Sequence, residues 1–198
     1  MVEHYFTEKP KSKKILIPFS CTIRKMHFRF YSSPSTFSVG KLDKGTELLA
    51  ETMEIGNASS ILDMGCGIGI LGIVASKINP NASITLVDVN ERALELAEKN
   101  AKSNKCQNIT VVKSDLYESF EKTFDAIVSN PPQKAGKDVC FKMIEDSILH
   151  LNRHGSLQIV ARHNKGGKEL EKKMKQVFGN VSEIAKKAGY RVYKGIKV

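Results

Sequence analysis

The corner at Asn130, Pro131 and Pro132 has a clear chemical character. It follows FDAIVS, residues 124–129, an apolar run typical of a buried strand. Two prolines remove two backbone N–H donors and fix two φ angles, and they favour an extended residue before them. What remains is a stiff backbone with carbonyl oxygens and one amide side chain. We therefore expect this corner to accept hydrogen bonds from a bound molecule.

A glycine-rich loop, DMGCGIGILG at residues 63–72, matches two nucleotide-binding patterns. Gly67, Gly69 and Gly72 fit GxGxxG, the dinucleotide pattern, whereas Asp63, Gly65, Gly67 and Gly69 fit DxGxGxG, the S-adenosylmethionine pattern. In both cases the glycines allow the backbone to approach a ligand closely, just before a helix N-terminus. The loop alone therefore predicts an adenosine-containing ligand.

Three carboxylates accompany this loop. Asp88 follows Gly69 by 19 residues, where a carboxylate accepts both ribose hydroxyls of either ligand. Asp63 can brace the loop or accept from the amino group of S-adenosylmethionine, and it would repel a pyrophosphate. Asp115 is placed to accept from an adenine amino group, with a turn cap as its structural alternative. Asp63 and Asp115 together favour S-adenosylmethionine.

Four segments in this order and spacing, ILDMGCGIG, VDVN, SDLY and VSNPP, resemble Rossmann-like methyltransferases that modify exocyclic or amide nitrogens. Upstream, FSVGKLDKGTELL is similar to the segment before the glycine loop in the methyltransferase small-domain family, which includes enzymes that methylate guanine N2 of ribosomal RNA. The resemblance extends from Phe37 to the C-terminus. The bacterial ribosomal RNA enzymes have an additional N-terminal half, so the chain resembles the compact single-domain archaeal relatives.

The resemblance implies a role for the proline corner. The side-chain oxygen of Asn130 and the carbonyl of Pro131 would hold the hydrogens of the target amine and free its lone pair, with S-adenosylmethionine as the methyl donor. Pro131 and Pro132 add rigidity and no competing donor. Asn130 therefore belongs to both the catalytic and the cofactor-binding residues, and no general base is required.

Position 133 departs from the related amine and amide methyltransferases. They usually have Tyr, Phe or Trp there to stack on the target, and this chain has Gln133. Gln133 is instead a candidate to hydrogen-bond the target's edge. Phe37 is a candidate for the apolar face and equally for a core position. Lys134 and Lys137 are candidates for contact with phosphates, or ordinary exposed lysines at a helix start.

The positive charge lies at the two ends of the chain. Residues 1–50 have a net charge of +5, residues 51–149 of −4 and residues 150–198 of +9. One interpretation is a solvated lysine-rich surface, and the other is two basic flanks that meet on a polyanion, with RNA as the natural candidate.

Other features restrict the class of protein. No apolar run approaches the ~18–20 residues of a membrane span, and the first residues lack the apolar core of a secretory signal. The four cysteines form no CxxC pair, so we expect neither a metal site nor disulfides. These features predict a cytoplasmic protein without a membrane partner.

The elements that must position these residues alternate between strand and helix, which predicts an α/β fold of the Rossmann-like class with a mostly parallel seven-stranded sheet and helices on both faces. The carboxyl ends of its strands would bring the glycine loop, Asp88, Asp115 and Asn130 together. We expect a basic N-terminal extension at 1–36 with a strand or hairpin, and a methyltransferase domain at 37–198. Expected strands lie at 59–65, 83–89, 108–115, 124–130 and 155–162, helices at 42–55, 70–78, 90–104, 137–152 and 166–179, and a closing antiparallel hairpin at 181–198.

The sequence therefore predicts an S-adenosylmethionine-dependent methyltransferase acting on an exocyclic amine of an RNA base, with guanine N2 of ribosomal RNA as the leading target. RNA is preferred to DNA because the chain has no spare domain for sequence readout. The alternatives are a transfer RNA base, a protein glutamine, an NAD-dependent oxidoreductase or a non-catalytic RNA-binding module.

Overall fold

The computed structural model describes residues 15–34, 39–132 and 136–198. A seven-stranded sheet forms the centre, in the strand order β5-β4-β3-β6-β7-β9-β8. Strands β5, β4, β3, β6 and β7 are parallel, and β9 and β8 complete the sheet as the predicted antiparallel hairpin. Its strands are β3 (Ser60–Met64), β4 (Ser83–Asp88), β5 (Ile109–Lys113), β6 (Phe124–Ser129), β7 (Leu151–Arg162), β8 (Val181–Lys187) and β9 (Tyr190–Ile196).

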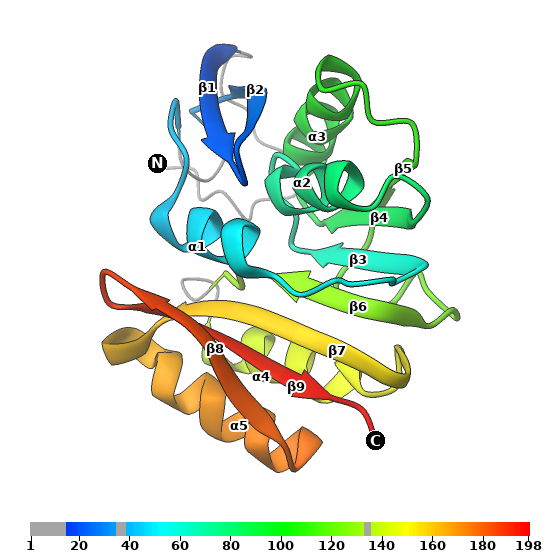
Figure 1. Cartoon of the computed structure of the whole chain (residues 1–198), viewed down its shortest axis with the longest axis vertical. Coiled ribbons are helices and arrows are strands. Elements are labelled where there is room, and N and C mark those ends of the chain that lie inside the picture. Colours follow the sequence, from blue (N-terminus) through cyan, green and yellow to red (C-terminus); the bar gives the residue numbers. More distant parts are fainter. Residues whose placement is uncertain (1–14, 35–38, 133–135) are drawn as a thin grey trace.

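Helices cover both faces of the sheet, so the predicted fold class is confirmed (Figure 1). One face is covered by α1 (Lys44–Thr52), α2 (Ile70–Ile78) and α3 (Glu91–Ser103), and the other by α4 (Lys137–Ser147) and α5 (Lys168–Phe178). An irregular turn, η2 (His163–Gly167), in which Lys165 and Gly166 have non-helical backbone angles, joins β7 to α5.

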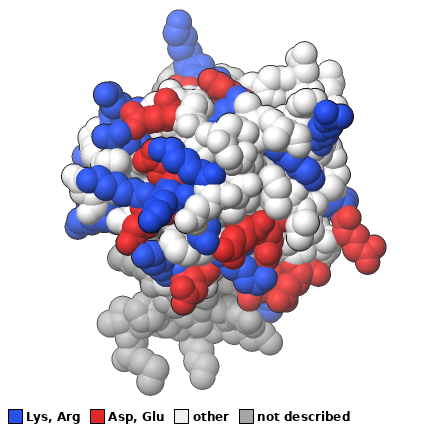
Figure 2. Space-filling view, turned by 90° about the horizontal axis from the view of Figure 1, so that it is seen from below, with Lys and Arg blue, Asp and Glu red and all other residues white. Residues whose placement is uncertain are grey.

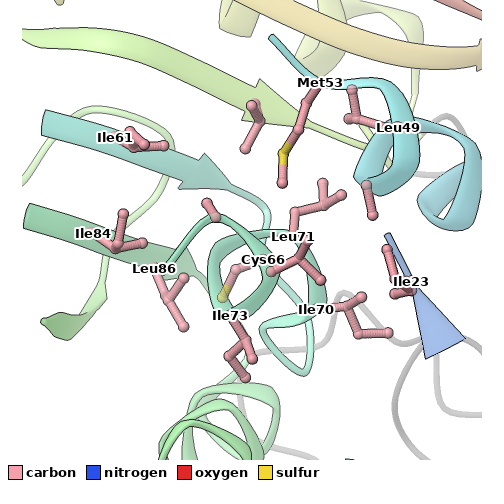
Figure 3. Packing of buried hydrophobic residues seen from close by; sticks show 14 of the residues in the cluster. Ile23, Leu49, Met53, Ile61, Cys66, Ile70, Leu71, Ile73, Ile84 and Leu86 are labelled. Atoms are coloured by element: carbon pink, nitrogen blue, oxygen red, sulfur yellow. The ribbon is translucent and has the colours of Figure 1, made fainter. Parts of the chain in front are cut away.

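Alternate side chains of the central strands enter two separate cores. Along β3, Ile61 packs on the side of α1 and α2, and Leu62 packs on the side of α4 and α5. Both are fully buried, which is why such strands are continuous apolar runs without polar alternation. Figure 3 shows the first core, to which Met53 at the C-cap of α1, Leu71 of α2 and Leu86 of β4 all belong.

The strand or hairpin expected within residues 1–36 is observed as a separate antiparallel pair, β1 (Ile17–Ile23) and β2 (Met26–Ser32). Asn100 of α3 and Asn104, the C-cap of this helix, attach the hairpin to the domain. Asn100 Oδ1 accepts from the backbone N–H of Tyr31 at 2.8 Å, and its Nδ2 donates to the carbonyls of Tyr31 and Ile68, both at 3.0 Å. Asn104 makes the same pair of contacts with the backbone of Arg29.

The prediction that the helix starting at residue 137 continues almost to Gly155 is wrong. Helix α4 ends at Ser147, a short turn follows, and β7 already begins at Leu151, which is fully buried and pairs with Phe124. The register then shifts between Phe124 and Ala126, which marks a bulge. A Cβ at Gly155 would lie 2.8 Å from the carbonyl oxygen of Asn152, so this glycine allows close backbone packing inside a strand.

We expect Asn100→Ala to lower the free energy of unfolding by about 2–4 kcal/mol, because it leaves buried backbone groups without partners. Urea denaturation monitored by circular dichroism would measure the loss. The matched control is Asn104→Ala, at a more exposed position with the same pattern of contacts, which should cost about 1 kcal/mol. Equal losses for the two variants would contradict this account of the hairpin's attachment.

Candidate active site

The glycine loop connects β3 to α2 at the carboxyl edge of the sheet. Gly65, Gly67 and Gly69 have φ values of 68°, 53° and 86°, in the left-handed region that favours glycine. Gly69 is the N-cap of α2 and has no side chain with which to cap the helix, so the first N–H groups of α2 depend on other partners. The next glycine of the GxGxxG pattern has a packing role, because a Cβ at Gly72 would lie only 2.0 Å from Leu86 Cδ2.

Asp88, at the end of β4, holds this loop from the neighbouring strand. Its Oδ2 accepts from the Gly67 N–H at 2.8 Å, and its Oδ1 accepts from the Asn90 N–H at 2.9 Å. Burial raises the pKa of the Asp88 carboxyl, while backbone hydrogen bonds oppose the rise. Each carboxylate oxygen has a second lone pair, so Asp88 can fix the loop and still accept from a ligand.

Asp63 lies beneath the loop, and its side chain is 1% exposed. Its Oδ2 accepts from the Gly72 N–H at 2.8 Å, which braces the first turn of α2. Its Oδ1 is buried and has no partner among the described residues. Burial raises the pKa of Asp63 to about 7, assisted by the nearby Asp88 and opposed by the Gly72 hydrogen bond. The carboxylate therefore both braces the loop and keeps one acceptor available to a ligand.

A cavity of about 390 Å³ opens at this edge, within the range of small-molecule sites. The predicted residues among those lining it are Asp63, Gly65, Gly67, Asp88, Asp115, Asn130, Pro131 and Pro132. Gly69 is adjacent in the chain and does not line it. Apolar side chains complete the wall, namely Met64, Ile68, Ile70, Leu71, Val87, Val89, Ala93, Leu116, Val139 and Met143. Most of the polar groups that the sequence predicts for the site therefore meet at one cavity.

Cys66 also lines the cavity, but its thiol is not an activated nucleophile. Burial, together with the negative charges of Asp63 and Asp88, raises the pKa of Cys66 well above its ordinary value. The thiol therefore stays protonated at neutral pH, and the thiolate is the reactive form.

The amide of Asn130 is held in one orientation by helix α1. Its Nδ2 donates to Asp43 Oδ2 at 3.0 Å and to Thr46 Oγ1 at 2.9 Å. A carboxylate only accepts hydrogen bonds, so the nitrogen of the amide must face Asp43 and the oxygen must face the other way. Thr46 donates its own hydroxyl hydrogen to Asp43 Oδ2, at 3.3 Å, which leaves its oxygen to accept from Asn130.

These contacts leave Asn130 Oδ1 with no hydrogen bond to any described residue, beside two prolines that offer no N–H. The arrangement presents acceptors only, as the sequence predicts for this corner. Sequence reasoning missed Asp43 and Thr46 as part of the site. Local patterns identify Asp43 only as a helix start, where it indeed caps α1 by accepting from the Thr46 N–H at 2.9 Å.

The remaining predicted residues are less informative. Phe37, Gln133 and Lys134 lie outside the described residues, and their roles stay predictions. Lys137 Nζ lies 2.8 Å from Glu169 Oε1, so this exposed lysine has a partner within the molecule. Asp115 is exposed at the margin of the cavity.

Two other kinds of site are absent from the described ranges. Within residues 15–34, 39–132 and 136–198, no group of three or more His, Cys, Asp or Glu side chains could hold a metal ion. None of the helices in the same ranges combines the length and the apolar character that a membrane span requires.

Comparisons with known proteins assign the chain to a family. The family model described as the methyltransferase small domain matches residues 27–194. The uncharacterized protein YbxB of Bacillus subtilis is 37% identical over 201 residues, with 100% of both chains covered. The ribosomal RNA small subunit methyltransferase C of Haemophilus influenzae (strain PittGG) is 38% identical over 82% of this chain and 49% of its own length. The chain thus spans about half the length of that curated relative.

A solved structure shares the fold. It is the Thermus thermophilus 16S rRNA N2 G1207 methyltransferase in complex with AdoMet and guanosine, with a TM-score of 0.81 and 24% identity. The match covers 96% of this chain and 52% of that chain.

The raised pKa of Asp63 predicts how stability depends on pH. Because the native carboxyl keeps its proton up to about pH 7, the native state binds more protons than the unfolded state between the ordinary value of 3.8 and 7. The free energy of unfolding of the unliganded protein should therefore fall as the pH rises through this window, by at most about 1.4 kcal/mol per pH unit. The fall is measured relative to Asp63→Asn, which keeps an acceptor for Gly72. Urea unfolding of both proteins at pH 5, 6 and 7 tests it, and parallel profiles would refute the expectation.

Proposed function

The chain belongs to the methyltransferase small domain family of S-adenosylmethionine-dependent methyltransferases, and we propose that it methylates an exocyclic amine of an RNA base, with guanine N2 of ribosomal RNA as the target. The observation that supports this proposal most directly is the fixed amide of Asn130. Its oxygen is the acceptor that an amine requires, and it lies in the wall of the same cavity as the glycine loop.

The residues around the cavity fit S-adenosylmethionine. The family assignment also favours this cofactor over the dinucleotide that GxGxxG alone would allow. We assign the free Asp63 Oδ1 to the ammonium group of the cofactor, Asp88 to the ribose hydroxyls and Asp115 to the adenine amino group. When bound, S-adenosylmethionine supplies an electrophilic methyl group on a sulfonium.

The proline corner then activates the target. Asn130 Oδ1 and the Pro131 carbonyl accept the two hydrogens of the amine, so the nitrogen lone pair is withdrawn from the ring and turned toward the cofactor site. As positive charge develops on nitrogen, these fixed acceptors stabilise it without reorganising. Once methylated, the positively charged nitrogen is a strong acid, so its proton can pass to water without a dedicated base.

The RNA target is supported by the relatives and by the charge of the chain. The Haemophilus relative is named for ribosomal RNA of the small subunit, although this chain spans only half of it. The net charge of +10 fits a polyanionic partner. A ribosomal RNA substrate would also agree with a cytoplasmic location. The boundary between residues 1–36 and 37–198 remains a prediction, since residues 35–38 lie outside the described ranges.

The first experiment is methyl transfer from labelled S-adenosylmethionine to unmethylated ribosomal RNA, transfer RNA and total protein, with Asn130→Ala in parallel. We expect label in ribosomal RNA, recovered as N2-methylguanosine after nucleoside digestion, and a loss of at least 100-fold in kcat for the variant, as for other fixed charge-stabilising groups. If the label appears in transfer RNA or in protein glutamine instead, that molecule is the substrate and ribosomal RNA is not. Full activity of Asn130→Ala would refute the role of the corner.

Asp43 and Thr46 should act as positioning residues. Asp43→Asn keeps a good N-cap for α1, but an amide can donate as well as accept, so it no longer dictates the orientation of Asn130. We expect kcat to fall about ten- to hundred-fold with little change in KM or in the thermal midpoint, because only the transition-state interaction is weakened.

The hydroxyl of Thr46 offers a matched pair of variants. Thr46→Val removes the hydroxyl and should lower kcat, whereas Thr46→Ser keeps it and should restore most of the activity. If Val and Ser variants are equally active, the hydroxyl does not position Asn130.

A further inference from the structure

Five exposed cations from three separate segments lie at the carboxyl edge of the sheet, and together we call them the cationic rim. They are Lys41, Lys44, Arg162, Lys165 and Lys187. Lys41 and Lys44 flank the cap of α1, Arg162 and Lys165 belong to the end of β7 and the turn after it, and Lys187 ends β8. None of them belongs to the site described above.

Strand register brings two of these cations to the same face. Arg162 pairs with Tyr190 across β7 and β9, and Lys187 pairs with Tyr190 across β8 and β9. Paired residues in antiparallel strands project to the same side, so Lys187, Tyr190 and Arg162 form a row. Their backbones are two strand spacings apart, about 10 Å, which allows the two cations to contact separate phosphates.

Tyr190 connects this row to the active site. A Cβ at Gly45 would lie 2.9 Å from the Tyr190 ring, so the ring lies directly against the first turn of α1. That turn begins at Asp43, the residue that orients Asn130. In addition, β7 continues three residues beyond Ile159, which pairs with Ser129 at the end of β6. The rim therefore lies beside the proline corner.

The cations of the rim have no acidic partner among the described residues. Elsewhere lysines pair within the molecule: Lys137 with Glu169, Lys173 with Glu145, and Lys194 with Glu54. Arg162 is exposed, and its guanidinium lies 5.6 Å from the centre of the Tyr190 ring, which supports it. A planar guanidinium held in this way is suited to bidentate contact with a phosphate.

The charge distribution supports the same conclusion. Figure 2 shows many Lys and Arg side chains, with some Asp and Glu among them, on the left of the face seen from below, the end where Figure 1 places the β8–β9 turn and the start of α5. Unpaired like charges repel one another and do not stabilise the fold, so their grouping favours an external anion.

We propose that the cationic rim binds the phosphate backbone of RNA next to the target nucleotide, so that the base can enter the cavity beside Asn130. This inference rests on the proposed function, and it adds the surface that holds the substrate. Such contacts are independent of sequence and fix the register of the nucleic acid.

The test compares two triple variants with equal changes in charge. The rim variant is Lys44→Gln, Arg162→Gln and Lys187→Gln. The control is Lys102→Gln, Lys105→Gln and Arg153→Gln, whose positions are exposed and lie outside the rim, at the end of α3 and near the start of β7. The probe is a fluorescein-labelled RNA stem-loop with unpaired guanosines, and binding is followed by anisotropy over a series of salt concentrations.

We expect the rim variant to bind this RNA at least ten-fold more weakly, with S-adenosylmethionine affinity unchanged. The slope of log K against log salt should fall by about 2, because each phosphate of single-stranded RNA that the protein neutralises adds about 0.7 to it. The control should change affinity less than two-fold. Equal reductions in affinity for both variants, or a rim variant that binds anionic lipid vesicles more weakly and RNA as before, would overturn the inference.

Methyl transfer by the wild-type protein is measured separately. If the wild-type protein methylates RNA but the rim variant binds RNA as tightly as the wild type, the role of the rim is refuted and the proposed function is not. If the wild-type protein methylates no RNA but its RNA binding still depends on the rim, the proposed function is refuted and the role of the rim is not.

Discussion

Three hydrogen bonds to one carboxylate oxygen, Asp43 Oδ2, join the first turn of α1 to the end of β6. The oxygen accepts from the backbone N–H and the hydroxyl of Thr46 and from the side chain of Asn130. The first of these hydrogen bonds starts α1, and the last one connects this helix to the end of β6. Because this oxygen can only accept hydrogen bonds, each of its partners must act as the donor. The orientation of the Asn130 amide is therefore a property of the fold, set before any ligand is bound.

The cofactor side of the cavity follows the same principle, since its carboxylates already hold backbone N–H groups. Asp88 fixes Gly67 from the neighbouring strand, and Asp63 fixes Gly72 at the start of α2. The loop is thus preorganised by acids that retain acceptor capacity for a ligand. The close approach of Gly72 to Leu86 also explains why the sequence satisfies two glycine patterns at once: one glycine serves packing between helix and strand, and the others serve the turn.

Much of this arrangement could be predicted from the sequence, and the failures have definite physical reasons. The parallel strands are recognisable because both faces are buried, and the helix expected at 90–104 is observed as α3, with Asn90 as its N-cap. The boundary between α4 and β7 is misplaced because Gly155 resembles a helix stop, whereas it permits a bulge that depends on contact with β6. The role of Asp43 toward Asn130 is missed because 87 residues separate them, and local patterns show the cap but not the distant partner.

The attachment of the β1–β2 hairpin has a consequence for divergence among relatives. Asn100 and Asn104 bind the backbone N–H and carbonyl groups of Tyr31 and Arg29, which every residue type except proline provides. Selection can therefore change the outward side chains of the hairpin without loosening its attachment. The same Asn100 holds the carbonyl of Ile68 in the glycine loop, so this asparagine itself is not free to vary. An adaptable peripheral surface and a constrained anchor are thus combined in one short segment, which lets new binding preferences arise without disturbing the chemistry.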